Sequence, residues 1–220
     1  MTRESVWINK IDISKNSFEI IIVQNGSNDN SLSIINSLKS KFYNLKLVDI
    51  KQNKGYGNGI IQGLKKAEGD LLAWTHADLQ TNPLDILEGL KYFKKNEEMI
   101  FVKGLRYGRN INDRFFTICM SIFASINLKC FLWDINAQPS IFPASFFKDW
   151  DNPPNDFSLD LYAYFLAKRK GYKIKRFNVK FTKRLFGVSK WNFNLKSKVK
   201  FIKRNLKYII KLSKDCTQWK

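Results

Sequence analysis

The chain has 220 residues, 44% of them hydrophobic and 15% aromatic, which excludes a disordered polypeptide and favours one domain with a sizeable core. Its 38 basic and 19 acidic side chains give a net charge of +19, and residues 161–220 hold half of the basic side chains but a single acid, Asp215. Such a charge is expected to face nucleic acid, anionic lipid or a phosphorylated substrate.

The first half of the chain alternates between predicted strands and helices. Short apolar, β-branched runs predict strands at residues 18–23, 45–50, 70–74 and 99–102. Helical spacing and helix-start signals predict helices at residues 31–41, 59–67 and 83–93. This alternation predicts an α/β fold with a mostly parallel sheet and helices on both faces.

The second half is less regular and more basic. Residues 115–133 are the most apolar long stretch, but Asn127 and Lys129 interrupt it, so it is predicted to be buried or interfacial rather than membrane-spanning. A helix at 158–170, a strand at 172–181 and a basic loop at 183–190 follow. Residues 196–214 predict a basic amphipathic helix whose apolar stripe is formed by Val199, Ile202, Leu206 and Ile209. We therefore expect a domain over residues 1–191 and a helical segment over 192–220.

Polar residues follow three of the predicted strands. Gln24 and Asn25 follow the first strand, Lys54 lies in a glycine-rich turn after the second, and a segment beginning at His76 follows the third. Ligands bind at the carboxyl ends of strands in open α/β sheets. We therefore expect these three segments to form one ligand site.

The segment after the third strand has the spacing of a metal site. His76, Asp78 and Gln80 alternate, so their side chains lie on one side of an extended turn. Asp78 and Gln80 offer hard oxygen ligands for a divalent cation, and His76 shifts the preference from Mg²⁺ toward Mn²⁺. The alternative is a surface turn in which Asp78 caps the following helix.

Four motifs, in order, resemble the family-2 glycosyltransferases of the GT-A fold, and among them the polyprenyl-phosphate sugar synthases of the dolichol-phosphate mannose synthase type. The four are VQNGSND at residues 23–29, NKGYG at 53–57, HADLQTNP at 76–83 and FTKRLFGVSK at 181–190. Together they cover residues 18 to 191, and their order makes the resemblance specific.

The chain departs from the family pattern at three places. Gln24 and Asn25 replace two acids, so the contact to the nucleotide base is expected to come from an amide. His76 replaces the first metal aspartate. No Pro-x-x-Asn-Glu pattern precedes residue 18, so we expect a fold shortened at its N-terminus.

The resemblance implies metal-dependent transfer of a sugar from a nucleoside-diphosphate sugar, with inversion at the sugar carbon. Gln24, Asn25 and Lys54 would bind the nucleotide-sugar, and Mn²⁺ or Mg²⁺ would sit on the His76 segment. Arg184, Ser189 and Lys190 would hold the diphosphate as negative charge develops on it. A solvated charge run is the alternative reading of that basic loop.

On the acceptor side, the resemblance implies that basic residues receive a phosphate. Arg106 and Arg109, with Lys103 and Arg114 nearby, are the candidates, against ordinary surface charge as the alternative. Asp134 and Gln138 would line the same side or cap a helix.

Asp160 has two possible roles. It would act as general base toward a sugar hydroxyl, whereas toward a phosphate acceptor, which is already an anion, it would orient basic residues. A salt bridge with Arg184 is the structural alternative.

The sequence also predicts the surroundings of the protein. Three sparse cysteines and the absence of an apolar signal segment in residues 1–15 predict a cytoplasmic protein with reduced thiols. The basic terminal helix predicts peripheral attachment to the anionic inner face of a membrane, near a lipid-linked or glycan acceptor or a membrane-protein partner. One alternative is a truncated, catalytically impaired scaffold. A nucleic-acid-binding module is disfavoured because no such motif occurs.

Overall fold

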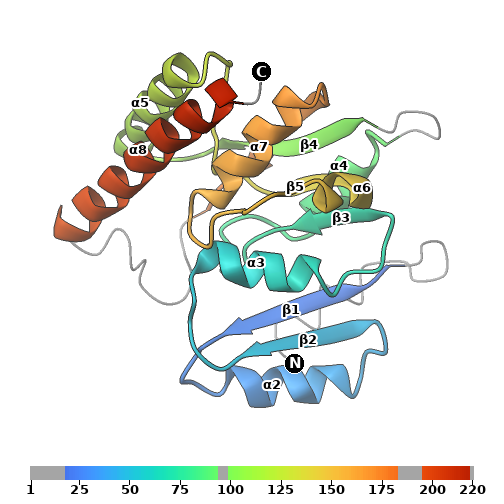
Figure 1. Ribbon diagram of the computed structural model, residues 1–220. Coiled ribbons are helices and arrows are strands. Elements are labelled where there is room, and N and C mark those ends of the chain that lie inside the picture. The colour runs from blue at the N-terminus through green and yellow to red at the C-terminus, as the bar shows by residue number, and fades with distance from the viewer. Residues whose placement is uncertain (1–17, 94–98, 183–194, 219–220) are drawn as a thin grey trace. The chain divides into compact units, whose positions relative to one another are not determined.

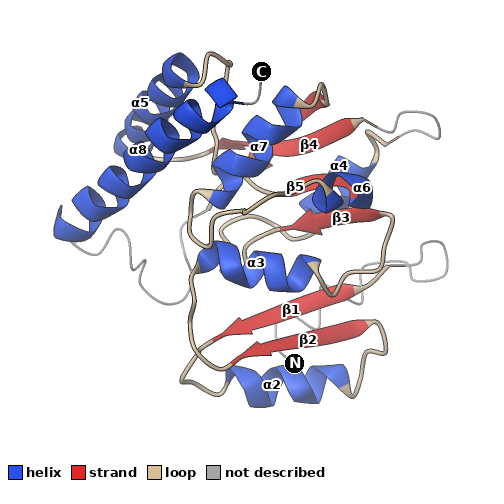
Figure 2. Ribbon diagram, in the orientation of Figure 1, coloured by secondary structure: helices blue, strands red, loops and turns tan. Residues whose placement is uncertain are grey.

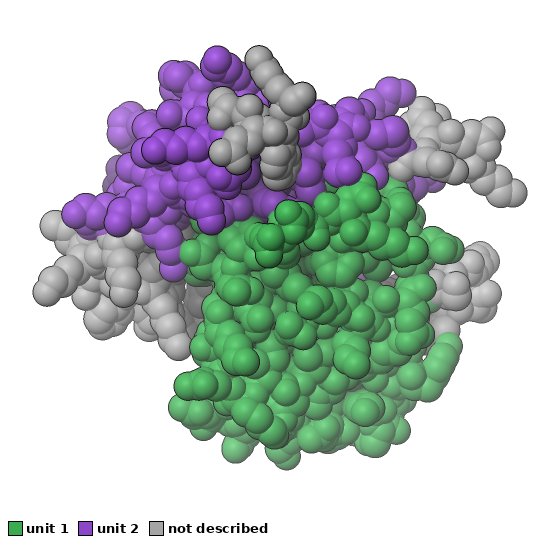
Figure 3. Space-filling view, viewed as in Figure 1, with its two compact units in different colours: residues 1–72, 142–159 green, residues 73–141, 160–220 purple. Residues whose placement is uncertain are grey.

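The computed structural model describes residues 18–93, 99–182 and 195–218. The chain forms two compact units (Figure 3): unit 1 comprises residues 1–72 and 142–159, and unit 2 comprises residues 73–141 and 160–220. The predicted boundary between residues 191 and 192 lies outside the described residues and stays a prediction.

Unit 1 is built on a parallel strand pair. β1 (Ile20–Asn25) pairs with β2 (Leu45–Ile50) over their whole lengths, from Ile20 opposite Leu45 to Asn25 opposite Ile50. α2 (Ser31–Lys39) buries its own apolar stripe through Ile35 and Leu38. These elements were expected from the alternating pattern, and the bounds of β2 are those of the predicted strand.

Glycines let α3 (Tyr56–Leu64) lie close to its neighbours in unit 1. A Cβ added at Gly63 would come within 2.9 Å of Val23 Cγ2, so any larger residue would push α3 away from β1. At the other end of α3, Gly57 lies against residues 154–156, where a Cβ would come within 2.3 Å of the Pro154 carbonyl oxygen. The Tyr56 ring stacks on Phe157 at 4.5 Å between centroids and holds the same segment.

The second segment of unit 1 contains the short helix α6 (Ala144–Lys148) and an aromatic group around it. The rings of Phe142, Phe146 and Trp150 lie 5.4–6.0 Å apart between centroids. Two of the three pairs meet edge to face, which is a favoured arrangement of aromatic rings.

A four-stranded sheet has the order β3-β5-β4-β6 (Figure 2). β4 (Ile100–Tyr107) runs parallel to β6 (Lys173–Lys180) over eight residue pairs and antiparallel to β5 (Ser140–Pro143). The boundary between the two units cuts through two strands of this sheet, β5 and β3 (Leu71–Trp74). The predicted strand at 99–102 was too short, because β4 continues through the charged residues Lys103 and Arg106.

Helices of unit 2 cover both faces of this sheet. Ile100 and Val102 point to one face, where they pack with residues of and just beyond α4 (Asp85–Leu90). Phe101 points to the opposite face and stacks on Tyr164 of α7 (Leu159–Arg169). The expectation of a parallel-rich sheet with helices on both faces is therefore confirmed, with β5 as an antiparallel member.

A second core lies between three helices of unit 2. α5 (Ile111–Asn127) contributes Ala124, α7 contributes Phe165, and α8 (Leu195–Gln218) contributes Ile209 and Leu212. Figure 1 shows α5 and α8 side by side. The stripe of α8 was predicted to attach the protein to a membrane, and for Ile209 this was wrong, because Ile209 is fully buried against protein. Within the described residues, no helix is long and apolar enough to cross a bilayer.

Candidate functional site

The first two sequence motifs meet in unit 1. Asn25, at the end of β1, donates from Nδ2 to the Gly55 carbonyl oxygen at 2.9 Å. Gly26 has a φ of +67°, and a Cβ there would lie 2.4 Å from the backbone nitrogen of Asn53. The expected convergence is therefore confirmed for these two segments, and Lys54 lies exposed at their junction.

The two amides that replace the family's acids already serve the local structure. Gln24 exchanges two hydrogen bonds with Ser27, accepting from its backbone nitrogen at 3.1 Å and donating to its carbonyl oxygen at 3.3 Å. Asn25 needs an amide, because a carboxylate could not donate to Gly55. Its Oδ1 atom is buried and has no hydrogen-bond partner among the described residues. Asn25 therefore keeps one buried acceptor, while both polar atoms of Gln24 are engaged.

The third motif meets the start of the fourth in unit 2. The Asp78 carboxylate accepts from the Gln80 backbone nitrogen at 3.2 Å, around Leu79 at a φ of +58°. Gln80 and Thr182 are joined twice: the Thr182 backbone nitrogen donates to the Gln80 carbonyl oxygen at 2.8 Å, and Gln80 Nε2 donates to the Thr182 carbonyl oxygen at 3.3 Å. The turn is thereby fixed to the end of β6.

The turn from Asp78 to Gln80 could hold a divalent cation only if a bound ligand supplied further oxygen atoms. Among the described residues, no three His, Cys, Asp or Glu side chains are grouped as metal ligands. Asp78 can supply one carboxylate, and Gln80 can supply its Oε1, since Nε2 is the atom bonded to Thr182. Mg²⁺ and similar ions are commonly held by one or two protein oxygens plus substrate phosphates. The alternative reading, in which Asp78 caps the following helix, was wrong: α4 has Leu84 at its N-cap and no side-chain capping bond, and the Asp78 carboxylate instead accepts from the backbone of its own turn.

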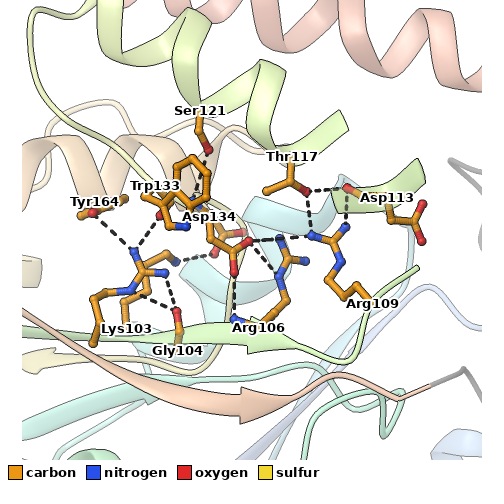
Figure 4. Close-up of polar contacts among 12 residues, drawn as sticks. Lys103, Gly104, Arg106, Arg109, Asp113, Thr117, Ser121, Trp133, Asp134 and Tyr164 are labelled. Carbon is orange, nitrogen blue, oxygen red and sulfur yellow. Dashed lines mark hydrogen bonds and ion pairs between the residues drawn. The ribbon is translucent and has the colours of Figure 1, made fainter. Parts of the chain in front are cut away.

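A buried charge cluster occupies the end of β4 (Figure 4). Its centre is Asp134, whose carboxylate accepts from Arg106 at the backbone nitrogen (2.9 Å), at Nε (3.0 Å) and at Nη2. The Arg109 Nη1 atom lies 3.9 Å from the same carboxylate. Burial alone would raise the pKa of Asp134, but the charge and hydrogen bonds of Arg106 outweigh burial and hold this pKa below its usual value.

Arg109 is fixed on its other side by α5. It donates to Thr117 Oγ1 at 2.6 Å and to the Asp113 carbonyl oxygen at 3.2 Å. Its Nε atom is buried and has no hydrogen-bond partner among the described residues. Burial, aided by the charge of Arg106, lowers the pKa of Arg109 to about 10, which still leaves it charged at neutral pH.

Phe181, the first residue of the fourth motif, lies under both arginines. The ring centroid is 5.4 Å from the guanidinium carbon of Arg106 and 5.5 Å from that of Arg109. Both lie within the range of cation–π attraction. Consecutive residues at the end of β6 thus hold the arginines, through Phe181, and the metal-like turn, through Thr182.

Lys103, predicted only as a basic residue near Arg106 and Arg109, extends the cluster as a buried lysine. Lys103 is fully buried in β4, with Nζ 3.1 Å from Ser140 Oγ and 3.6 Å from Asp160 Oδ1. Burial lowers the pKa of Lys103 to about 8, against the opposing effect of Asp160. A lysine inside the apolar run IFVKG was the available signal, since buried lysines need a partner. The described partner of Asp160 is therefore Lys103, while Arg184 lies outside the described residues.

The predicted residues are thus gathered in two sets. Asn25, Gln24 and Lys54 meet in unit 1. In unit 2, Gln80 joins the turn of Asp78 to Thr182, and Arg106 and Arg109 lie over the Phe181 ring. Asp134 pairs with Arg106, and Gln138 is buried beside Gly104 in the same unit. Arg184, Ser189 and Lys190 lie outside the described residues and stay predictions. Among the described residues, positive charge is in excess in this cluster: the interacting cations are Lys103, Arg106, Arg109 and Arg176, and the interacting carboxylates are Asp134, Asp160 and Asp113.

The sequence is similar to those of known proteins. Residues 7–200 match the family model described as glycosyl transferase family 2. The chain is 31% identical over 94 residues to a dolichol-phosphate mannosyltransferase of Mycosarcoma maydis, covering 43% of this chain and 31% of that protein. It is 30% identical over 91 residues to the uncharacterized glycosyltransferase YkcC of Bacillus subtilis, covering 41% and 28%. The aligned part is thus less than a third of either relative.

Solved structures agree with this placement. Glucosyl-3-phosphoglycerate synthase from Mycobacterium tuberculosis, in complex with Mn²⁺, UDP and glucosyl-3-phosphoglycerate, superposes with a TM-score of 0.61 at 14% identity, over 87% of this chain and 66% of that one. Mannosyltransferase PcManGT from Pyrobaculum calidifontis, in complex with GDP-Man and Mn²⁺, gives 0.60 at 14% identity, over 83% and 53%. These likenesses concern the fold. With the family model matched over most of its length, the chain belongs to glycosyl transferase family 2 and has the GT-A fold.

Proposed function

We propose that this chain carries out inverting, metal-dependent transfer of a sugar from a nucleoside-diphosphate sugar to an acceptor that bears a phosphate, of the lipid-linked polyprenyl phosphate class. The observation that carries the proposal is the end of β6. There, Thr182 holds the turn of Asp78 and Gln80, and Phe181 holds Arg106 and Arg109. One short segment thus connects a candidate metal turn with candidate acceptor cations.

The metal turn supplies the donor chemistry. Asp78 and Gln80, with His76, would hold Mn²⁺ or Mg²⁺, which neutralises the diphosphate as it leaves the sugar. Of the related structures, two that contain a nucleotide or nucleotide-sugar also contain Mn²⁺, which supports this assignment. Arg184, Ser189 and Lys190 would add cationic and polar contacts to the same diphosphate.

In unit 1, Asn25 is the better of the two candidates for the nucleotide base. Its buried Oδ1 can accept from an N–H group of a base, whereas both polar atoms of Gln24 are already bonded to Ser27. An accepting amide oxygen at this position would replace the carboxylate of the family's usual motif, and Lys54 would contact the donor from the same junction. Gln24 would then support the loop rather than touch the ligand.

The buried cluster favours a phosphate acceptor over a sugar hydroxyl. Among the described residues, four interacting cations against three carboxylates leave positive charge in a place of low exposure, which an anionic ligand would neutralise. A phosphate oxygen attacks without losing a proton, so no general base is needed. Asp160 is almost fully buried and paired with Lys103, so it is better suited to hold that lysine than to take a proton from an acceptor.

The decisive experiment measures sugar transfer from UDP- and GDP-sugars to a short polyprenyl phosphate in the presence of Mn²⁺. Asp78→Asn should reduce turnover by at least a hundredfold at saturating Mn²⁺, while Glu88→Gln, which removes an exposed carboxylate of α4, should not change it. Wild-type turnover in Asp78→Asn would refute the metal assignment. Donor binding without any transfer by the wild-type chain would instead favour a catalytically impaired scaffold.

Transfer to a lipid-linked acceptor requires access to a membrane. We accordingly propose that the protein works peripherally at an anionic membrane surface on its cytoplasmic side, attracted by its net charge of +19.

A further inference from the structure

The outer side of α5 is unusually apolar. Ile111, Phe115, Cys119, Ile122 and Ile126 follow one another at steps of three and four residues, so they share one side of the helix, called here the α5 face. The four large side chains among them are 82%, 67%, 52% and 71% exposed, and Cys119 is also exposed. Beyond the helix end, Phe131 is exposed as well.

The opposite side of α5 packs in the core of unit 2. The side chains that α5 buries most deeply are the small residues Ser121 and Ala124. Met120 and Phe123 are partly buried and pack against the same core, whereas the large side chains of the α5 face lie on the side of the helix that does not. A row of exposed isoleucine and phenylalanine of this kind marks an interaction surface, since monomeric soluble proteins rarely expose contiguous apolar patches of this kind.

The neighbouring helix brings positive charge. α8 packs on α5 through Ile209 and Leu212, and it exposes a row of lysines at steps of three and four residues: Lys203, Lys207, Lys211 and Lys214. The partner of the α5 face must therefore tolerate an apolar contact beside a dense row of cations. A second copy of this chain would bring a second basic α8 close to the first, whereas an anionic bilayer offers both hydrocarbon and negative headgroups.

We infer that the α5 face inserts into the interfacial region of an anionic bilayer while the lysines of α8 meet the headgroups. The apolar contact then comes from α5, and α8 contributes charge and holds α5 in place. This inference rests on the proposed peripheral membrane location and assigns it to particular residues. Residues 115–133 were predicted from the sequence to be buried or interfacial. On this inference, one side of the segment packs in the core and the other contacts lipid.

The test is co-sedimentation of the full chain with vesicles of phosphatidylglycerol and phosphatidylcholine, compared with phosphatidylcholine alone, at 0.1 M and 1 M NaCl. Phe115→Ser with Ile126→Ser should lower binding to anionic vesicles at least tenfold at 1 M NaCl, where screening has removed the charge attraction. Lys207→Gln with Lys211→Gln should instead weaken binding mainly at 0.1 M NaCl.

The matched control is Tyr43→Ser with Leu87→Ser, which removes two exposed large side chains elsewhere on the surface and should bind as wild type does. Circular dichroism and the melting temperature verify folding, which these exposed substitutions should preserve. Equal vesicle binding by the α5 variant and the control would overturn the inference. So would a wild-type dimer that ignores vesicles and dissociates in the α5 variant.

Vesicle binding is measured without donor or acceptor. A wild-type chain that binds vesicles through the α5 face but transfers no sugar would contradict the proposed function alone. Conversely, transfer to a water-soluble, short-chain acceptor should persist in the α5 variant, because the substituted residues lie outside the charge cluster and the metal turn.

Discussion

Asp134→Asn tests whether the buried charge cluster depends on one carboxylate. Asp134 has a side chain only 6% exposed and accepts three hydrogen bonds from Arg106. An asparagine keeps the shape but removes the charge, so the buried Arg106 loses its ion-pair partner and Arg109 loses the carboxylate 3.9 Å from its Nη1 atom. Removing one partner of a buried ion pair costs about 3–5 kcal/mol. For a chain of this length that corresponds to a fall in melting temperature of roughly 6–20 °C.

The assay is thermal and urea unfolding followed by far-ultraviolet circular dichroism, with Glu88→Gln as the control. Glu88 also pairs with a cation, Lys91, but its side chain is 52% exposed. An exposed pair of this kind contributes about 1 kcal/mol or less. If Asp134→Asn and Glu88→Gln differ by under about 1 kcal/mol, the guanidinium groups are solvated or paired elsewhere. The reasoning about a buried excess of positive charge would then be wrong.

Two further predictions concern the same cluster. Because the folded-state pKa of Asp134 is lowered, its stabilising effect is present above the unfolded pKa of about 3.9 and is lost as the pH falls through the folded value. Melting temperatures measured between pH 2 and 6 should therefore fall more steeply for wild type than for Asp134→Asn. Parallel curves for the two proteins would contradict this prediction. Lys103→Met should lower the free energy of unfolding by about 3–5 kcal/mol at neutral pH, because it removes the buried cation beside Asp160. Adding Asp160→Asn should recover part of that loss in the double variant. Urea unfolding that shows additive losses would mean that the two residues do not depend on each other.

Sequence patterns predicted most helices and strands, because the apolar spacing of these segments matches their burial in the fold. β2 is a short apolar run with turns on both sides, and α7 shows helical spacing in a segment that is almost entirely buried. β4 was predicted too short because Lys103 interrupts its apolar run. Its partner Asp160 lies on α7, far along the chain, and no local pattern reports such a pairing.

The two amphipathic helices show where periodicity stops being informative. The spacing of apolar residues in α5 is that of a core helix, yet its most buried residues are Ser121 and Ala124, and Ile111, Ile122 and Ile126 are exposed. In α8 the apolar stripe was assigned to a membrane, yet Ile209 packs in the core. Periodicity identifies a side of a helix but not its partner, which depends on tertiary packing.

The candidate site was predictable to the extent that motifs carried it. Asn25 and Asp78 were found from the motifs, and Arg106 from the acceptor side that the resemblance implies. Asn25 bonds Gly55 of the second motif and Arg106 bonds Asp134, whereas Asp78 bonds Gln80 within its own motif. The engagement of Gln24 with Ser27 was not predictable, because it depends on the local turn and not on residue type.

The adjacency of Phe181 and Thr182 has a consequence for how this sequence can change over evolutionary time. Consecutive residues share one peptide plane, so no hinge separates the ring under the two arginines from the backbone that holds Gln80. Under the proposed function, a substitution that shifts β6 to suit a new acceptor would also displace the turn that would bind the donor. Preferences for the two substrates are therefore expected to drift together in descendants of this chain, and exchanging one alone would require compensating changes on both sides of that peptide.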